Sequence, residues 1–275
     1  MKPIYINGAA RIGACPTVAT GPFPIAEPDY TQYVPKKKLR RMDRLTRFAL
    51  HTTYAALEEA DLTEIDGVIM GVGQTVSKIM DGMLRKMIDQ QEGLTNPTSF
   101  MNSLLSTAAG QVALQLSCNG YTNTHSQRGF SLESALLDAA VFLDKNTERQ
   151  LVVGGLDVTH ESYAELADNY GHLAANSTEG IVRPVGEGAA TFVVGAMPSP
   201  RTQACIREIY TAFLTETARR EWSAIELGQT LFNGAPPTAD LIISGRPLGN
   251  EAQELYADIL SAFPSETPII EYKRI

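Results

Sequence analysis

Strand-type and helix-type apolar patterns alternate along the chain, and this alternation restricts its fold more than any other feature. Short apolar runs occur at DGVIMG (66–71) and QLVVGG (150–155), whereas residues 42–60, 104–116 and 132–144 repeat apolar residues at helical spacing. Strands that alternate with helices favour an α/β fold, in which helices cover a sheet. We therefore expect a layered α/β protein.

The alternation continues to the end of the chain, without a low-complexity linker. We expect one domain over 1–275, with a first half over 1–197 and a shorter second half over 198–275, separated near two prolines. Between the clear elements, GYTNTHSQRGFS (120–131) is rich in turn-forming residues, and we expect EGLTNPTSF (92–100) to be a loop. Further strands are expected at 186–197, 205–210, 240–244 and 268–272, and further helices at 218–230 and 250–263.

Composition excludes several classes of protein. Hydrophobic residues make up 44% and charged residues 20%, as in an ordinary globular protein. Only three cysteines occur, so neither a disulfide framework nor a cysteine metal site is indicated, and we expect no cofactor. The net charge of −8 disfavours nucleic-acid binding. The chain shows neither a membrane-spanning run nor a secretory signal, so we expect it in the cytoplasm.

A local basic run interrupts this acidic chain at KKKLRRMDRLTR (36–47). Such a run often forms only a solvated face. The functional alternative is a docking patch for an acidic partner, where complementary charge raises the association rate and sets the register. The candidate residues are Lys36, Lys37, Lys38, Arg40 and Arg41, with Arg44 and Arg47 beyond them.

Three methionines lie on one face of a strongly amphipathic helix predicted over 77–90. Met80, Met83 and Met87 fit simple core packing. Because methionine is flexible and polarizable, they also fit the lining of an interface or of an acyl-chain site.

Several stretches, taken in order, resemble the β-ketoacyl synthases, the condensing enzymes of the thiolase fold. RMDRLTRFAL, NPTSFMNSLLSTAAGQVALQL and LVVGGLD each resemble a family segment, and RPVGEGAATFVV contains the family turn at Gly186, Glu187 and Gly188. The resemblance implies a layered α-β-α-β-α thiolase-like fold with mixed sheets and a shortened second half. It also implies a tunnel or dimer interface near Phe100 and Met101.

The same resemblance implies that the catalytic residues are missing. Gly129 stands where active members carry the nucleophilic cysteine, and Ser244 lies closest to the first catalytic histidine. Lys273 matches a family lysine, but the second histidine that should follow is absent before Ile275. Glycine has no side chain to acylate, and serine cannot match histidine in stabilising a developing enolate. These positions indicate a non-catalytic member.

A residual polar site remains conceivable near the vacant position. His125, Gln127 and Ser131 surround Gly129 in sequence. They could simply satisfy a loop, or Ser131 could act as a nucleophile with His125 or His160 as its base. His51, on a helix, fits packing or a surface position better than a catalytic role.

Three functions are consistent with the sequence. The first is a chain-length-factor-like subunit that pairs with an active ketosynthase in polyketide or fatty-acid elongation, by resemblance of the aryl polyene or flexirubin pigment type. Such a pair could also receive an acyl carrier protein on the basic run. The second is a residual acyltransferase or hydrolase that uses Ser131. The third is a homodimeric module that binds an acyl group or a carrier protein.

Overall fold

The structure is a computed structural model, and it describes residues 2–13, 25–73, 78–91, 93, 96–158, 187–209, 239–244, 259–261 and 263–271. The chain divides into two compact units, Met1–Ile209 and Tyr210–Ile275. Among the described residues, none of the helices has the length and apolar character needed to cross a membrane.

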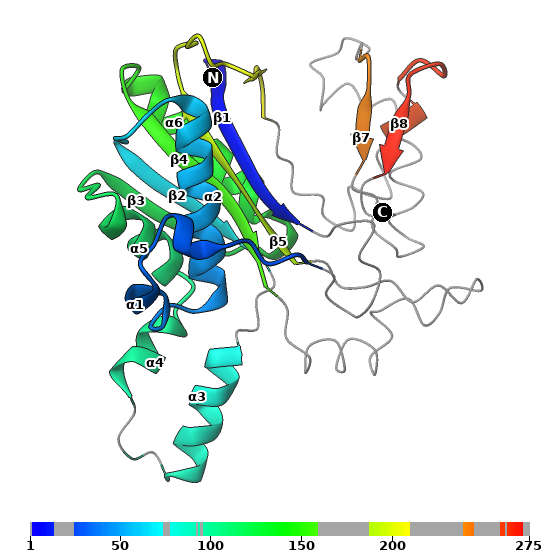
Figure 1. The fold of residues 1–275 in the computed structure, drawn as a ribbon. Helices are drawn as coiled ribbons and strands as arrows, with labels where there is room; N and C mark the ends of the chain where they lie inside the picture. Colours follow the sequence, from blue (N-terminus) through cyan, green and yellow to red (C-terminus); the bar gives the residue numbers. More distant parts are fainter. Residues whose placement is uncertain are drawn as a thin grey trace. The chain divides into compact units, whose positions relative to one another are not determined.

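The first unit is built on a six-stranded mixed sheet (Figure 1), with strand order β3-β2-β4-β5-β1-β6. β2 pairs in parallel with both β3 and β4, whereas β5 is antiparallel to β4 and β1, and β6 is antiparallel to β1. The strands are β1 (Ile4–Gly13), β2 (Gly67–Val72), β3 (Tyr121–His125), β4 (Gln150–Asp157), β5 (Gly188–Gly195) and β6 (Ala204–Ile206). β3 lies at one edge of this sheet.

Helices cover both faces of the sheet, as the alternating pattern predicts. On one face, α2 (Arg44–Ala60) and α5 (Thr107–Gln115) pack with Val68 and Val152. On the other face, α6 (Ser131–Lys145) packs with Ile69, which follows Val68 on the same strand. Because neighbouring strand residues point to opposite faces, both sides of the central strands are apolar.

Local signals explain where α2 begins and ends. The Asp43 side chain accepts a hydrogen bond from the Thr46 amide at 2.8 Å and so caps the first turn. At the other end Asp61 adopts the left-handed conformation, with φ of 57°, and closes the helix. The buried residues of α2 include Phe48 and Leu50, both at most 1% exposed.

The structure corrects two expectations about the middle of the chain. The predicted loop over 92–100 contains the start of α4 (Pro97–Asn102), because Pro97 occupies the first helical turn and Asn96 caps it. The turn-rich stretch over 120–131 contains a strand, β3, which β2 holds by parallel pairing. Pairing within the sheet outweighs the turn preference of its asparagine and threonines.

The short helix α1 (Lys36–Leu39), the longer helix α3 (Lys78–Asp89) and the strand β6 complete the described part of the first unit. α1 precedes α2, and α3 lies beyond the sheet rather than against either of its faces (Figure 1). The strand expected over 205–210 is shorter, since β6 ends at Ile206. The helix expected over 218–230 lies outside the described residues, as does most of the one over 250–263.

The second unit contains a parallel pair of short strands, β7 (Ile242–Ser244) and β8 (Ile269–Glu271). Ile242 lies opposite Ile269, and the amide of Ile242 donates to the Pro268 carbonyl at 2.9 Å. Both strands were expected from their apolar runs.

One glycine permits the close approach of β2 to the beginning of α6. A Cβ atom placed on Gly71 would lie 2.4 Å from the carbonyl oxygen of Ser131, far inside contact distance. That oxygen belongs to the backbone and cannot rotate away. Any side chain at position 71 would therefore displace α6 from the sheet.

We predict that Gly71→Ala lowers the free energy of unfolding by more than about 2 kcal/mol, because the backbone of α6 must move. Gly110 provides the matched control. It lies within α5, and a Cβ placed there meets no atom within 4 Å. Gly110→Ala should raise stability by about 0.5–1 kcal/mol through helix propensity. Urea unfolding of both variants tests the contrast, and an equal effect at the two sites would contradict it.

Candidate functional site

The carboxyl end of β3 and the beginning of α6 enclose the turn that carries the predicted site residues. His125 ends β3, a 3-10 turn follows at Arg128–Phe130, and Ser131 begins α6. In α/β folds, ligands commonly bind outside the carboxyl ends of strands, so this turn has the expected location for a site.

Gly129, for which the family resemblance predicts the nucleophile position, lies exposed within the 3-10 turn. A Cβ atom built on it would meet no atom within 4 Å. A side chain could therefore be accommodated here, yet glycine offers no group that could be acylated.

The hydroxyl of Ser131 is engaged in structure. Ser131 is only 3% exposed, and its Oγ donates to the Val72 carbonyl at 2.8 Å. The same oxygen accepts a hydrogen bond from the Gln127 amide at 2.8 Å. These bonds tie the turn to β2, so a nucleophilic role for Ser131 would require them to break.

Gln127 braces the same turn from the other side. Its side-chain carbonyl oxygen accepts a hydrogen bond from the Ser134 hydroxyl, whose Oγ also lies 2.9 Å from the Phe130 carbonyl oxygen. Gln127 therefore holds the turn against the first turns of α6.

His125 belongs to a polar cluster between β3 and α6 that is centred on Asp138. The Nε2 atom of His125 lies 2.9 Å from Asp138 Oδ2, and Asn123 Nδ2 donates to the same oxygen at 2.9 Å. The Tyr121 hydroxyl donates to both carboxylate oxygens at 3.1 Å. Burial, and then the hydrogen bond to Asp138, raise the pKa of Tyr121. This carboxylate fixes the orientation of the His125 ring.

The sequence analysis predicts His125 but not the other three members of this cluster, Tyr121, Asn123 and Asp138. Tyr121, Asn123 and His125 alternate along β3 and therefore share one face of the strand. On α6, Ser134 and Asp138 are four residues apart and share one helix face. Recognising a strand at 121–125 would have brought these residues together.

Glu187, from the Gly-Glu-Gly motif, is paired with Arg44. The Glu187 side chain is completely buried, and Arg44 Nη1 donates to it while Arg44 Nε donates to Glu27 at 2.6 Å. Burial opposes the charge of Arg44, but the two carboxylates outweigh this effect and raise its pKa. This pair links the start of β5 to the start of α2.

The basic run separates into an inward and an outward part. Arg44 pairs with the buried carboxylate, and Arg47 donates to the Leu39 carbonyl at 2.9 Å. Lys38 donates to Gln115 at 2.8 Å. Four cations on and next to α1 are exposed and form no ion pair within the described residues: Lys36, Lys37, Arg40 and Arg41.

The predicted interface residues lie on α3 and α4, which contact each other. Met80, Met83 and Met87 are half-buried on α3. Phe100 and Met101 on α4 are 52% and 53% exposed. Leu84 and Ile88 on α3, and Leu104 just after α4, are further exposed apolar side chains.

Other predicted residues lie outside the described part of the chain. Gly186, Lys273 and His160 belong to this group. Ser244 ends β7, with its backbone described but its side chain not. Their relation to the turn at Gly129 stays a prediction.

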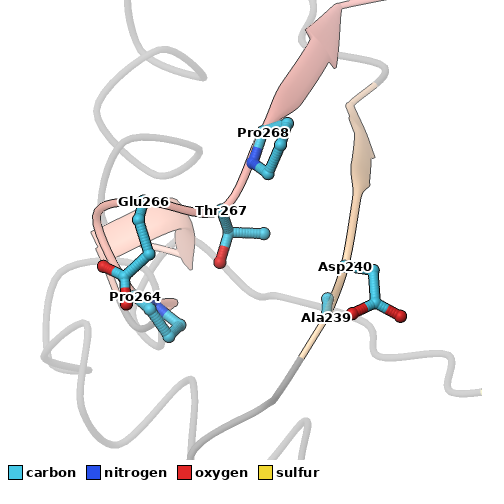
Figure 2. Close-up of a pocket in the computed structure, with 6 residues that line it drawn as sticks. All are labelled: Ala239, Asp240, Pro264, Glu266, Thr267 and Pro268. Atoms are coloured by element: carbon cyan, nitrogen blue, oxygen red, sulfur yellow. The ribbon is translucent and has the colours of Figure 1, made fainter.

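A cavity of about 400 Å³ in the second unit contains none of the predicted site residues (Figure 2). It lies beside the amino ends of β7 and β8, and its lining residues are Ala239, Asp240, Pro264, Glu266, Thr267 and Pro268. In the described ranges, His, Cys, Asp and Glu side chains form no group of three that could hold a metal ion.

We predict that Asp138→Ala destabilises the first unit by about 1–3 kcal/mol, because three partly buried groups lose their shared acceptor. Asp144, exposed near the end of the same helix, is the control. Within the described part of the chain its only ion pair is with Lys2, at 4.0 Å, so Asp144→Ala should change stability by less than about 0.5 kcal/mol. Chemical unfolding of both variants measures the difference. Equal losses would show that Asp138 does not organise the cluster.

Comparison with known proteins places this scaffold in a family. The family described as "Beta-ketoacyl synthase, N-terminal domain" matches residues 23–196. The chain is 25% identical over 147 residues to 3-oxoacyl-[acyl-carrier-protein] synthase 2 of Synechocystis sp., covering 50% of this chain and 35% of that protein. The synthase 2 of Staphylococcus aureus strain N315 is 24% identical over 174 residues, or 59% and 41% of the two chains. Less than half the length of each curated relative is therefore matched.

Solved structures share the fold at low sequence identity. A chain described as "The ishigamide ketosynthase/chain length factor" aligns with a TM-score of 0.66 and 16% identity, over 97% of this chain and 83% of that one. A complex of a type II polyketide ketosynthase with its acyl-carrier protein aligns with a TM-score of 0.70 and 14% identity, over 98% of this chain and 83% of that one. A complex of a ketosynthase with its chain length factor from Xenorhabdus doucetiae aligns with a TM-score of 0.52 and 14% identity, over 71% of this chain and 79% of that one.

These likenesses agree with the mixed sheet and its helices, and they confirm the expected thiolase-like ketosynthase fold. The family match begins before α1 and extends just past the end of β5, and so includes the turn at Gly129. The chain belongs to the β-ketoacyl synthase family.

Proposed function

We propose that this chain is a non-catalytic, chain-length-factor-like subunit that pairs with an active β-ketoacyl synthase during polyketide or fatty-acid chain elongation. The observation that carries this proposal is the glycine at position 129. It occupies an exposed turn before α6, where the family resemblance expects the nucleophile. The scaffold around this turn is kept, whereas the group that would be acylated is absent.

The residues next to Gly129 support a structural use of the turn. Ser131 is buried and bonded to Val72 and Gln127, and His125 is held by Asp138. A nucleophile and its base need mutual hydrogen-bond geometry. Here each group has another partner, which disfavours the residual acyltransferase with Ser131.

The apolar surface on α3 and α4 supports the presence of a partner. Phe100, Met101 and Leu104 are each about half exposed, and Ile88 is 76% exposed. Contiguous exposed apolar side chains commonly mark an interface. In the proposed complex this surface contacts the ketosynthase, and the methionines of α3 line the space for the growing chain. The solved relatives described as ketosynthase–chain length factor complexes make a heterodimer the preferred assembly. By resemblance, a pigment-type pathway is the proposed setting.

The test is co-expression of the tagged chain with candidate ketosynthases, followed by mass determination during size exclusion and a malonyl condensation assay. We expect a one-to-one complex whose condensation activity is lost when either chain is omitted. Condensation by this chain alone would overturn the proposal. A homodimer that binds none of the ketosynthases but binds an acyl carrier protein would instead favour the homodimeric binding module.

We predict that Gly129→Cys folds normally and gains a reactive surface thiol, because the position opens to free space. Alkylation followed by peptide mass spectrometry should find the label at position 129, against the background from exposed Cys205 of the unaltered chain. The variant alone should show no condensation, since by the family resemblance Ser244 stands at the position of the first catalytic histidine. Condensation by this variant would contradict the proposed loss of function.

We further propose that the exposed cations of α1 receive an acidic acyl carrier protein. A triple reversal, Lys37→Glu, Arg40→Glu and Arg41→Glu, should weaken carrier binding about tenfold or more at low salt, with the difference shrinking as salt rises. Lys145→Glu, on an exposed site of α6, should have little effect. Titrations with carrier protein at two salt concentrations measure this. Equal losses in both variants would reject α1 as the docking site.

A further inference from the structure

A short segment, Glu27–Val34, crosses α2 and leads directly into α1; we call it the strap. Asp29 caps its single 3-10 turn by accepting a hydrogen bond from the Thr31 amide at 2.9 Å. At its end Val34 is buried, only 2% exposed, and its amide donates to the Tyr30 carbonyl at 3.1 Å. The strap is therefore an ordered part of the first unit.

His51 of α2 lies against both tyrosine rings of the strap. Its ring centroid is 5.8 Å from that of Tyr30 and 5.2 Å from that of Tyr33, and both pairs meet edge to face. The Nδ1 atom of His51 is buried and has no hydrogen-bond partner within the described residues. A neutral imidazole fits this place, whereas a protonated one would bury a charged donor without an acceptor.

Tyrosine and carboxylate side chains of the strap make further contacts with α2. The Tyr33 ring stacks on Tyr54, with centroids 5.3 Å apart, and its hydroxyl donates to Glu58 at 2.7 Å. The Tyr30 hydroxyl donates to Glu27, which accepts from Arg44. His51 lies between these two sets of contacts.

Burial lowers the pKa of His51, while the negative charges of Asp29 and Glu58 oppose this effect. Burial and the hydrogen bond to Glu58 raise the pKa of Tyr33 to about 12, so Tyr33 stays neutral throughout the range discussed here. Around His51, the titratable and charged groups are Glu27, Asp29, Tyr30 and Tyr33 of the strap and Arg44, Arg47, Tyr54 and Glu58 of α2. Of the other elements packed on α2, α5 and β5 carry no titratable side chain, and β1 and β4 carry Tyr5, Arg11 and Asp157.

Only Pro35 separates the strap from α1, and its carbonyl accepts hydrogen bonds from the amides of Lys38 and Leu39. α1 is held in addition by the bonds of Lys38 to Gln115 and of Arg47 to the Leu39 carbonyl. Release of the strap would therefore remove one of the attachments that position the basic residues of α1.

We propose that His51 is a pH-sensitive latch: its neutral ring holds the strap on α2, and its protonation releases the strap and so removes one attachment of α1. The release itself is a property of this chain alone. Its effect on carrier docking rests on the proposed function of α1.

The size of the effect follows from proton linkage. In the released state His51 titrates near its ordinary pKa of 6.5, whereas the closed state binds its proton only at lower pH. The closed strap is therefore fully stabilised above pH 6.5 and loses this stabilisation as the pH falls. Between pH 8 and pH 5.8 the opening equilibrium should rise by up to about sixfold.

Amide hydrogen exchange on the full chain tests the latch. After correction for intrinsic exchange rates, peptides covering residues 26–41 should lose up to about sixfold protection between pH 8 and pH 5.8. In His51→Phe, which keeps a ring between the tyrosines, this change should fall below about twofold. His125→Gln, a matched loss of another histidine, should leave the pH dependence of the strap as in the unaltered chain.

A second measurement keeps the proposal testable if His51→Phe does not fold. Carbon-13 labelled histidine in the unaltered chain should show one resonance that titrates below pH 6.5, with the same midpoint as the loss of strap protection. Protection that does not change with pH, or that changes equally in His51→Phe, would overturn the latch. Because no carrier or ketosynthase is present, this result is independent of the proposed function. If the latch holds, a carrier that binds equally at both pH values would reject only the link to α1.

Discussion

The burial of β2 and β4 on both faces is the constraint on which the first unit depends. β2 is buried at every residue, and Val68 and Ile69 point into different apolar clusters. Each face needs its own helical cover, which α2 and α5 provide on one side and α6 on the other. At about 25 cal/mol per Å² of buried apolar surface, this double burial is the main source of stability. It also holds α6 so close to β2 that only glycine fits at position 71.

The same constraint sets the geometry of the turn at Gly129. Because α6 is fixed against β2, the chain between β3 and α6 must turn sharply, and Ser131 and Gln127 supply the bonds that stabilise the turn. In a catalytic relative such a turn would present a nucleophile. Here the turn presents Gly129 to open space, which under the proposed function leaves the support of an active site without its reactive group.

Much of the fold could be predicted because the strongest patterns coincide with the sheet and its helices. The apolar runs at β2, β4 and β5 and the helical spacing of α2 and α6 are strong local signals. The sequence of β3 contains no such local signal. Its polar residues are held in a strand by pairing with β2 and by contacts with Asp138. α4 was missed because Pro97 suggested a loop, although proline is well suited to a first helical turn.

The candidate site was predictable only in part for a related reason. His125, Gln127 and Ser131 are neighbours in sequence, so a turn could bring them together. Tyr121 lies near them because it is on the strand β3, and Asp138 because it is on the facing side of α6. Neither position follows when residues 120–131 are interpreted as turns. The inward direction of Arg44 was equally hidden, because its partner Glu187 is 143 positions away.

In the proposed complex, the acyl chemistry takes place on the partner ketosynthase and not on this chain. Intact-mass spectrometry of each subunit, after the reconstituted pair is incubated with an acyl thioester, measures where the acyl group is bound. We expect one acyl adduct on the cysteine of the ketosynthase and an unchanged mass for this chain. An acyl adduct on this chain, located at Ser131 by peptide mapping, would contradict it.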